Sequence, residues 1–167
     1  LRCEHCYQSQ FSTDSHVSVN AAEHVLREID KLRTSLGRKR KVFMTLTGGE
    51  PFLHPQLPRL IEMVVKSPFV KSYSLLTNGL LIDDAAIKWL KKYTPRYVQV
   101  SLDGSKSTHE KIRGQDTYQA TLEGIKRLVS SRLRVSISFT ATRRNFREFA
   151  NVARIARRLR AHSIWTD

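Results

Sequence analysis

The sequence contains few of the features on which secreted and membrane proteins depend. Its 167 residues include two cysteines, Cys3 and Cys6, and no apolar run approaches the roughly 20 residues that cross a membrane. So few cysteines exclude a scaffold held by several disulfides, and the charged first residues are unlike a signal peptide. We therefore expect a folded cytoplasmic protein with no membrane partner.

Acidic residues are also scarce, at 15 against 29 lysines and arginines, which gives a net charge of +14. This excess favours acidic partners such as nucleic acid, phosphates or an acidic peptide. The basic runs at 38–41 and 154–160 lack interleaved aromatic side chains for base stacking, which argues against nucleic acid. The simplest interpretation of both runs is a solvated surface.

The spacing of apolar residues predicts that helices and strands alternate along the chain. Helices are predicted over 21–36, 57–65, 83–92, 118–129 and 149–159, and strands over 42–47, 73–76, 97–102, 135–140 and 163–165. Asn20 with Glu23 is predicted to cap the first helix, and Asn145 with Glu148 the last. Strands joined by helices form a parallel sheet, so we expect an α/β fold, either an open doubly wound sheet or part of a barrel.

Glycines and polar residues follow the predicted strands, where parallel sheets bind their ligands. They are Gly48, Gly49, Glu50 and Pro51 after the first strand, Thr77, Asn78 and Gly79 after the second, Ser101, Asp103 and Gly104 at the third, and Thr140 and Thr142 after the fourth. Each group alone is an ordinary turn signal. Together they predict a ligand site at one edge of the sheet.

The cysteine pair, with His5 between its members, has several interpretations. Two thiolates at this spacing fit half of a zinc site, a redox dithiol, two ligands of an iron–sulfur cluster, or an inert pair. They do not complete any usual metal site. The remaining histidines have no mutual spacing typical of metal ligands, and we interpret them as structural or surface residues: His16, His24, His54, His109 and His162.

The order of these motifs, rather than any one of them, resembles a known family. The segments CEHC, TGGEP, TNG, SLDG and HEKIRG follow one another as in the radical S-adenosylmethionine (radical SAM) superfamily, over residues 1 to about 124. The resemblance is closest to the SPASM-type branch of peptide-modifying and sulfatase-maturing enzymes. It implies a radical SAM core domain over 1–167, folded as a partial (β/α)6 TIM-like barrel. We expect it to be truncated at both ends.

The resemblance also implies cofactors and chemistry. Cys3 and Cys6 match the second and third cysteines of the motif Cys-x-x-x-Cys-x-x-Cys, whose first cysteine falls before Leu1. Three thiolates hold a four-iron four-sulfur cluster, and its open iron binds S-adenosylmethionine. An electron from a donor such as flavodoxin or ferredoxin then yields a 5′-deoxyadenosyl radical, which abstracts hydrogen from the substrate. A peptide or protein side chain is the implied substrate.

The cofactor-binding residues are expected at the motif positions. His5 stands where the family has a ring close to the adenine. Gly48 and Gly49 let the backbone approach the methionine end of the cofactor, because they have no Cβ. Asn78 belongs to the same predicted site.

Charged residues of the later motifs complete this expectation. Glu50 is predicted to pair with the ammonium of S-adenosylmethionine, and Arg113 with its carboxylate through the planar guanidinium. Ser101 and Asp103 are placed to hydrogen-bond the ribose or the methionine. The alternative is that Glu50 and Arg113 are an ordinary surface acid and base. No catalytic side chain is identified.

Three alternatives remain open at this stage. The first is a small-molecule maturase of the molybdenum-cofactor type, which belongs to the same superfamily and shares TGGEP. The second is a basic nucleic-acid-binding module with a zinc-bound cysteine pair. The third is an inactive relative that keeps the barrel as a binding scaffold.

Overall fold

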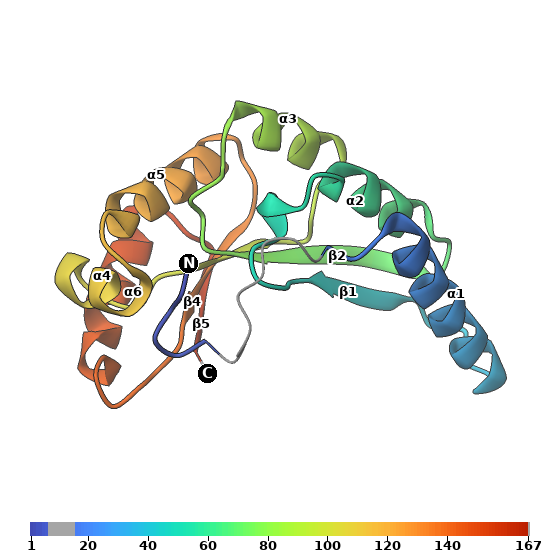
Figure 1. The fold of residues 1–167 in the computed structure, drawn as a ribbon, viewed down its shortest axis with the longest axis horizontal. Coiled ribbons are helices and arrows are strands. Elements are labelled where there is room, and N and C mark those ends of the chain that lie inside the picture. Colours follow the sequence, from blue (N-terminus) through green and yellow to red (C-terminus); the bar gives the residue numbers. More distant parts are fainter. Residues whose placement is uncertain (7–15, 167) are drawn as a thin grey trace.

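The computed structural model describes residues 1–6 and 16–166, and its centre is one parallel sheet (Figure 1). The five strands are adjacent in chain order: β1 (Val42–Leu46), β2 (Val70–Thr77), β3 (Val98–Ser101), β4 (Val135–Phe139) and β5 (Ser163–Thr166). The sheet is curved and does not close, so that β1 and β5 are its edges.

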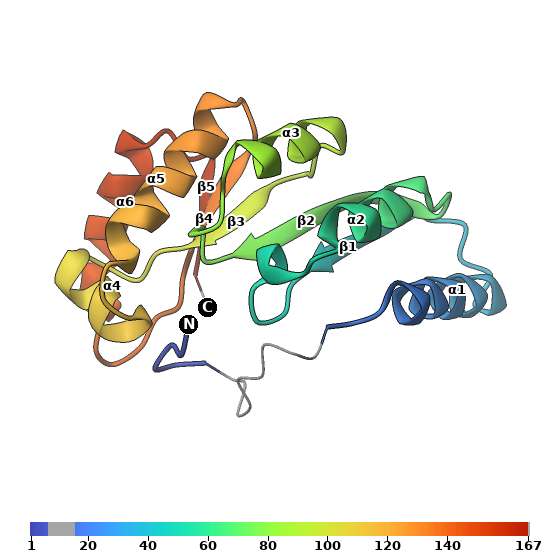
Figure 2. The ribbon, with the colours of Figure 1, turned by 45° about the horizontal axis from the view of Figure 1, so that its top comes forward.

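Helices connect the strands and cover one face of the sheet, and the first helix lies beside the edge strand (Figure 2). The helices are α1 (Val19–Ser35), α2 (Leu57–Lys66), α3 (Asp84–Lys92), α4 (Lys106–Arg113), α5 (Thr117–Ser130) and α6 (Phe149–Arg158), with short 3-10 turns η1 (Pro51–Leu53) and η2 (Phe146–Glu148). A doubly wound sheet has helices on both faces. Their placement on one face of a curved parallel sheet therefore confirms the partial barrel and not the doubly wound alternative.

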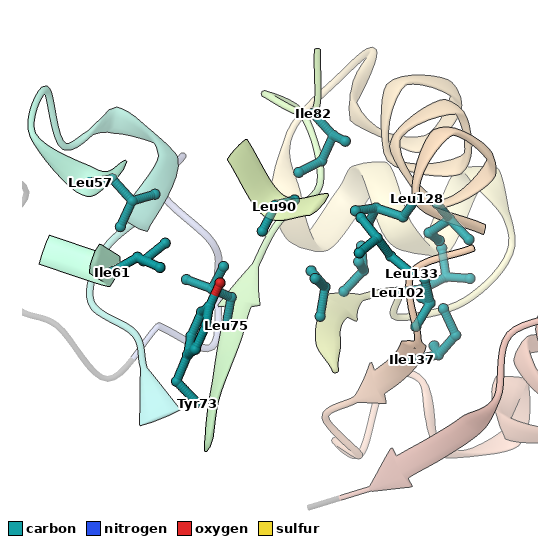
Figure 3. Close-up of a cluster of buried hydrophobic side chains, with 14 of the residues drawn as sticks. Leu57, Ile61, Tyr73, Leu75, Ile82, Leu90, Leu102, Leu128, Leu133 and Ile137 are labelled. Carbon is teal, nitrogen blue, oxygen red and sulfur yellow. The ribbon is translucent and has the colours of Figure 1, made fainter. Parts of the chain in front are cut away.

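The core lies between the sheet and these helices (Figure 3). Leu75 and Ile137 on the strands and Leu90 and Leu128 on the helices are fully buried. Alternate strand residues point to the other face, because strand side chains alternate. There Gln99 pairs in register with Ser136, whose hydroxyl accepts a hydrogen bond from Ser163 at 3.0 Å. The concave face thus carries many polar side chains, together with Phe43, Leu76 and Trp165, whereas the helix-covered face is apolar.

The predicted cap of the first helix is wrong. Helix α1 starts at Val19, and the Ser18 hydroxyl accepts the amide hydrogen of Ala21 at 3.1 Å, so Asn20 lies inside the helix. The predicted apolar face is also exposed at Leu32, which keeps 61% of its surface accessible, while Leu26 is buried. The reason is that α1 packs mainly against α2 beside the edge strand, which covers only a narrow part of its surface.

Helix α4 was not predicted, because its sequence KSTHEKIR contains a single large apolar residue, Ile112, and no helical apolar period. Its buried residues are His109, Ile112 and Arg113, so tertiary contacts rather than periodicity stabilise it. No helix in the described part of the chain has the length and apolar character to cross a membrane.

Candidate functional site

The carboxyl ends of β1 and β2 are joined through Glu50. Its Oε1 accepts hydrogen bonds from the Thr77 hydroxyl at 2.7 Å and the Phe52 amide at 3.1 Å, and its Oε2 accepts from the Asn78 amide at 2.8 Å. Burial raises the pKa of this carboxyl above its usual value, against these hydrogen bonds. Because a carboxylate oxygen can accept two hydrogen bonds, Oε2 retains capacity for one more donor.

Helix α5 holds the Asn78–Gly79 turn in place. The Thr121 hydroxyl donates to the Asn78 carbonyl at 3.0 Å, and Gly79 has a φ of +82°, a conformation that favours glycine. A Cβ added to Gly124 would lie 2.1 Å from the Gly79 carbonyl oxygen. Gly124 therefore permits the close approach of α5 that fixes this turn.

A buried ion pair lies at the carboxyl end of β3. Asp103 is fully buried, and its Oδ2 accepts from the Arg113 Nε at 2.5 Å. The second oxygen accepts from the Thr140 amide at 3.3 Å, and the Asn145 side chain donates to the Asp103 carbonyl at 3.2 Å. The predicted cap role of Asn145 is wrong, because its side chain connects the ends of β3 and β4 and makes no helix-capping bond.

His109 supports the same ion pair from α4. Its Nδ1 accepts the Asp103 amide hydrogen at 3.2 Å, and its ring packs edge-on against Tyr118. Burial lowers the pKa of His109 to about 4, so the ring is neutral at pH 7.

The cysteine turn is held against α4. The Cys6 amide donates to the Cys3 carbonyl at 3.0 Å, and the Glu4 amide donates to the Ile112 carbonyl at 2.9 Å. Glu4 also forms an ion pair with Arg144, which follows β4. The turn is therefore attached both to the end of α4 and to the loop after β4.

Arg113 connects this turn to the buried ion pair. Its Nη1 lies 3.8 Å from the Cys3 sulfur, and its Nη2 lies 3.5 Å from the His5 Nε2. Burial raises the pKa of the Cys3 thiol, while the Arg113 charge opposes this shift. Burial also lowers the pKa of His5. The guanidinium of Arg113, which belongs to HEKIRG, therefore contacts two other motifs, CEHC and SLDG.

The two cysteines are the residue type that binds iron–sulfur clusters, but they supply only part of the ligands that a cluster needs. Cys3 and Cys6 are free, partly exposed thiols, and no group of three or more potential metal ligands occurs within residues 1–6 and 16–166. Thiolates are the usual ligands of such clusters. The observed set is thus two of the three cysteines that the motif requires.

The remaining predicted residues leave room for a ligand. A Cβ added to Gly48 would meet nothing within 4 Å, and Gly48 lies outside the left-handed region, so no contact within the described protein requires glycine there. Gly49 is exposed beside it. Ser101 is half-buried, and its hydroxyl makes no hydrogen bond to the described residues. Asn78 uses its Oδ1 to accept the Leu80 amide hydrogen at 2.9 Å.

Of two cavities, the first borders the Asn78–Gly79 turn, because Gly79 and Leu80 line it, and the second lies away from the predicted site residues. The first, of about 540 Å³, is also lined by Phe52, Leu81, Trp89 and Arg127, on the helix-covered side. The other, of about 690 Å³, lies between α1 and α2. Neither cavity is lined by a cysteine or by Glu50, Asp103 or Arg113. The candidate site is therefore defined by its thiol and charged side chains and not by a cavity.

Three relatives resemble the chain in sequence. The Fe-coproporphyrin III synthase of Methanosarcina barkeri is 30% identical over 89% of this chain and 36% of its own length. The subtilosin biosynthesis protein AlbA of Bacillus subtilis is 28% identical over 100% and 37%. The GTP 3′,8-cyclase of Petrotoga mobilis is 30% identical over 75% and 38%. The chain thus spans less than two-fifths of the length of these relatives.

Two solved structures share the fold. One is anSMEcpe with bound AdoMet and the Kp18Cys peptide, which superposes with a TM-score of 0.80 at 20% identity over 99% of this chain and 47% of that one. The other is SuiB of Streptococcus suis bound to its precursor peptide SuiA, with a TM-score of 0.76 at 14% identity over 99% and 36%.

The family model of the radical SAM superfamily matches residues 1–162, which is nearly the whole chain. This match agrees with the order of the motifs and with their meeting at the carboxyl end of the sheet. The chain therefore belongs to the radical SAM superfamily, whose members use S-adenosylmethionine together with an iron–sulfur cluster.

Proposed function

We propose that the complete protein is a radical SAM enzyme that modifies a peptide or protein side chain. The observation that supports this most is the contact of Arg113 with Cys3 and Asp103, because it joins the cysteine turn to the motifs after β3. Two thiolates suit a cluster. Gly48, at which an added Cβ would meet nothing within 4 Å, suits a cofactor bound against the backbone.

The four-iron four-sulfur cluster and S-adenosylmethionine, when bound, supply an electron transfer that yields a carbon-centred radical able to abstract hydrogen. Cys3 and Cys6 would supply two of the thiolate ligands of the cluster. Gly48 and Gly49 keep the β1–η1 turn free of side chains where the methionine end of the cofactor binds. Electrons come from a small redox protein such as flavodoxin or ferredoxin.

The polar residues of the chain position the cofactor. Glu50 uses its remaining acceptor capacity for the ammonium group, and it is fixed by Thr77 and Asn78. Arg113 has five N–H donors, of which three already have partners, and it offers the others to the carboxylate. Ser101 binds the ribose or the methionine, and His5 lies against the adenine. Asp103, predicted from the sequence to bind the cofactor directly, is fully buried and instead holds Arg113 in position.

The proposed substrate class rests on the relatives. AlbA is named for the biosynthesis of a bacteriocin, and the anSMEcpe and SuiB structures were solved with peptides bound. The polar side chains on the concave face of the sheet, with Ser136 and Gln99 in register, are suited to a hydrogen-bonding substrate.

The proposed activity is tested by anaerobic reconstitution of the complete protein with iron and sulfide. We expect acid-labile sulfide in the protein and 5′-deoxyadenosine after reduction with S-adenosylmethionine. The Cys3→Ala and Cys6→Ala variants should lose both signals, while Ser130→Ala, on the exposed end of α5, should keep them. A formed cluster that gives no 5′-deoxyadenosine refutes the proposal, as does bound zinc without sulfide.

A small-molecule substrate is the second candidate, and the GTP cyclase and porphyrin synthase relatives support it. The same assay separates the two candidates. Peptides that raise the rate of 5′-deoxyadenosine formation favour the first, and stimulation by a nucleotide or a porphyrin, but by no peptide, favours the second.

A further inference from the structure

Four of the five connections that lead from helices into strands carry lysines or arginines. The five connections comprise residues 36–41, 67–69, 93–97, 131–134 and 159–162, and they contain no aspartate or glutamate. Their eight lysines and arginines form what we call the basic band: Arg38, Lys39, Arg40, Lys41, Arg96, Arg132, Arg134 and Arg160. Connections that leave the strands, in contrast, contain Glu50, Asp83 and Asp103.

The topology places the basic band along one edge of the molecule. Because all five strands are parallel and adjacent in chain order, their amino ends follow one another along the sheet. Adjacent strands are about 4.8 Å apart, so four intervals span about 19 Å. An extended peptide covers this distance with about six residues.

The basic band is not neutralised by the protein. Each of its eight side chains is exposed, and within residues 1–6 and 16–166 none has a carboxylate within 4.0 Å. Some basic residues on the helices are paired instead, since Arg33 pairs with Asp30 and Arg127 with Asp84. The band thus keeps several like charges close together, which repel one another unless an anion binds.

Two arginines of the band occupy positions that favour glycine. Arg132 and Arg160 follow α5 and α6 with φ values of +61° and +58°. Each helix closes with a 6→1 hydrogen bond, from Leu133 to Leu128 and from Ala161 to Ala156, and α1 ends in the same way with Gly37 at the equivalent position. Side chains with a Cβ are strained there. The backbone at these two positions favours glycine, so the presence of arginine there needs another explanation.

We propose that the basic band binds an acidic, extended peptide segment of a protein partner. The band lies at the amino ends of the strands, and the cofactor site lies at their carboxyl ends. Charge complementarity and the length of the band support this occupant. Single-stranded nucleic acid needs free aromatic faces for stacking. The ring of Phe43, which is partly exposed, already makes cation–π contacts with Lys71 and Arg96, and the Tyr93 ring makes one with Lys92.

The test measures binding of a fluorescein-labelled ten-residue oligoglutamate to the complete protein by fluorescence anisotropy, at low and at physiological salt. Arg132→Asn with Arg160→Asn removes two charges while retaining a residue that tolerates this conformation. We expect about tenfold weaker binding and a smaller salt dependence, as two exposed charges lose their partners. Arg132→Lys with Arg160→Lys should bind within about twofold of the wild type.

The matched control removes two charges elsewhere. Lys88→Gln with Lys126→Gln leaves the same net charge, but both residues are exposed on helices away from the band. Equal weakening by this control refutes the proposal, because binding would then follow net charge alone. Tighter binding of a single-stranded RNA than of the peptide, or no peptide binding at low salt, also overturns it. Formation of 5′-deoxyadenosine should be unchanged in every variant, which separates this proposal from the proposed function.

Discussion

At the carboxyl end of the sheet one ion pair is buried, whereas at the amino end the arginines of the basic band are exposed and without carboxylate partners in the described structure. Asp103 and Arg113 exemplify the first region, and Arg132 and Arg134 the second. Removal of one partner from a buried pair leaves an uncompensated charge, whereas an exposed charge remains hydrated when a neighbour is lost. Substitution of a charged residue should therefore lower the stability of the protein strongly in the first region and little in the second.

The largest effect is expected at the buried pair. Asp103→Asn leaves Arg113 without its carboxylate and should lower the free energy of unfolding by about 3–5 kcal/mol. Arg134→Gln, at the amino end, should change it by less than about 0.5 kcal/mol. Urea unfolding of both variants at pH 7 checks the difference. Similar losses in both variants would contradict the comparison.

The second prediction concerns acid. The pKa of His109 is about 4 in the folded protein, against about 6.5 when exposed, so the unfolded chain binds more protons between these values. Its contribution to stability is therefore complete above about pH 6.5 and is lost as the pH falls, by about 1.4 kcal/mol per unit and about 3 kcal/mol in all. Urea unfolding across this range should show a shallower slope for His109→Gln than for the wild type. Parallel pH profiles would exclude His109 as the cause.

Two glycine substitutions at the carboxyl end should separate folding from ligand binding. Gly124→Ala forces α5 away from the Gly79 carbonyl and should cost about 2 kcal/mol of stability. Gly48→Ala meets no protein atom, so its stability should not change, but it should weaken binding of S-adenosylmethionine to the reconstituted enzyme. Thermal unfolding and equilibrium dialysis measure the two properties. Equal stability of the two variants would show that α5 does not fix the turn.

The smallest effect is a gain in stability at the amino end. Arg132→Gly relieves a strained backbone conformation but loses a favourable charge at the end of α5, and the balance should be about 1 kcal/mol of stabilisation. Ser131→Gly, whose φ is −83°, should destabilise the protein and serves as the control. Thermal unfolding resolves these opposite signs. Destabilisation by Arg132→Gly would mean that folding itself requires the arginine.

Much of the architecture could be predicted because strands and helices with clear apolar periods alternate along the chain. Strand β4 and helix α5, for example, occur close to their predicted bounds. Helix α4 could not be found in this way, since its buried residues include His109 and Arg113. Asn20 was a plausible cap by sequence, but the choice between it and Ser18 depends on where the backbone turns.

The candidate site was predicted as a set of positions rather than as a network. Motif order indicated Glu50, Asp103 and Arg113, and parallel topology indicated that they lie at one edge. The contacts of Asn145 and Thr140 with Asp103 join residues about 40 positions apart in sequence. Such pairs depend on how neighbouring strand ends are aligned, which local patterns do not specify.

The open sheet has a consequence for handling the protein. Strands β1 and β5 each have one side without a strand partner in the described structure, and both present large exposed rings, Phe43 and Trp165. Strand edges of this kind add further strands from other molecules. The isolated 167-residue chain should therefore self-associate at high concentration, and dilute solutions or a covering partner for these edges would keep it monomeric.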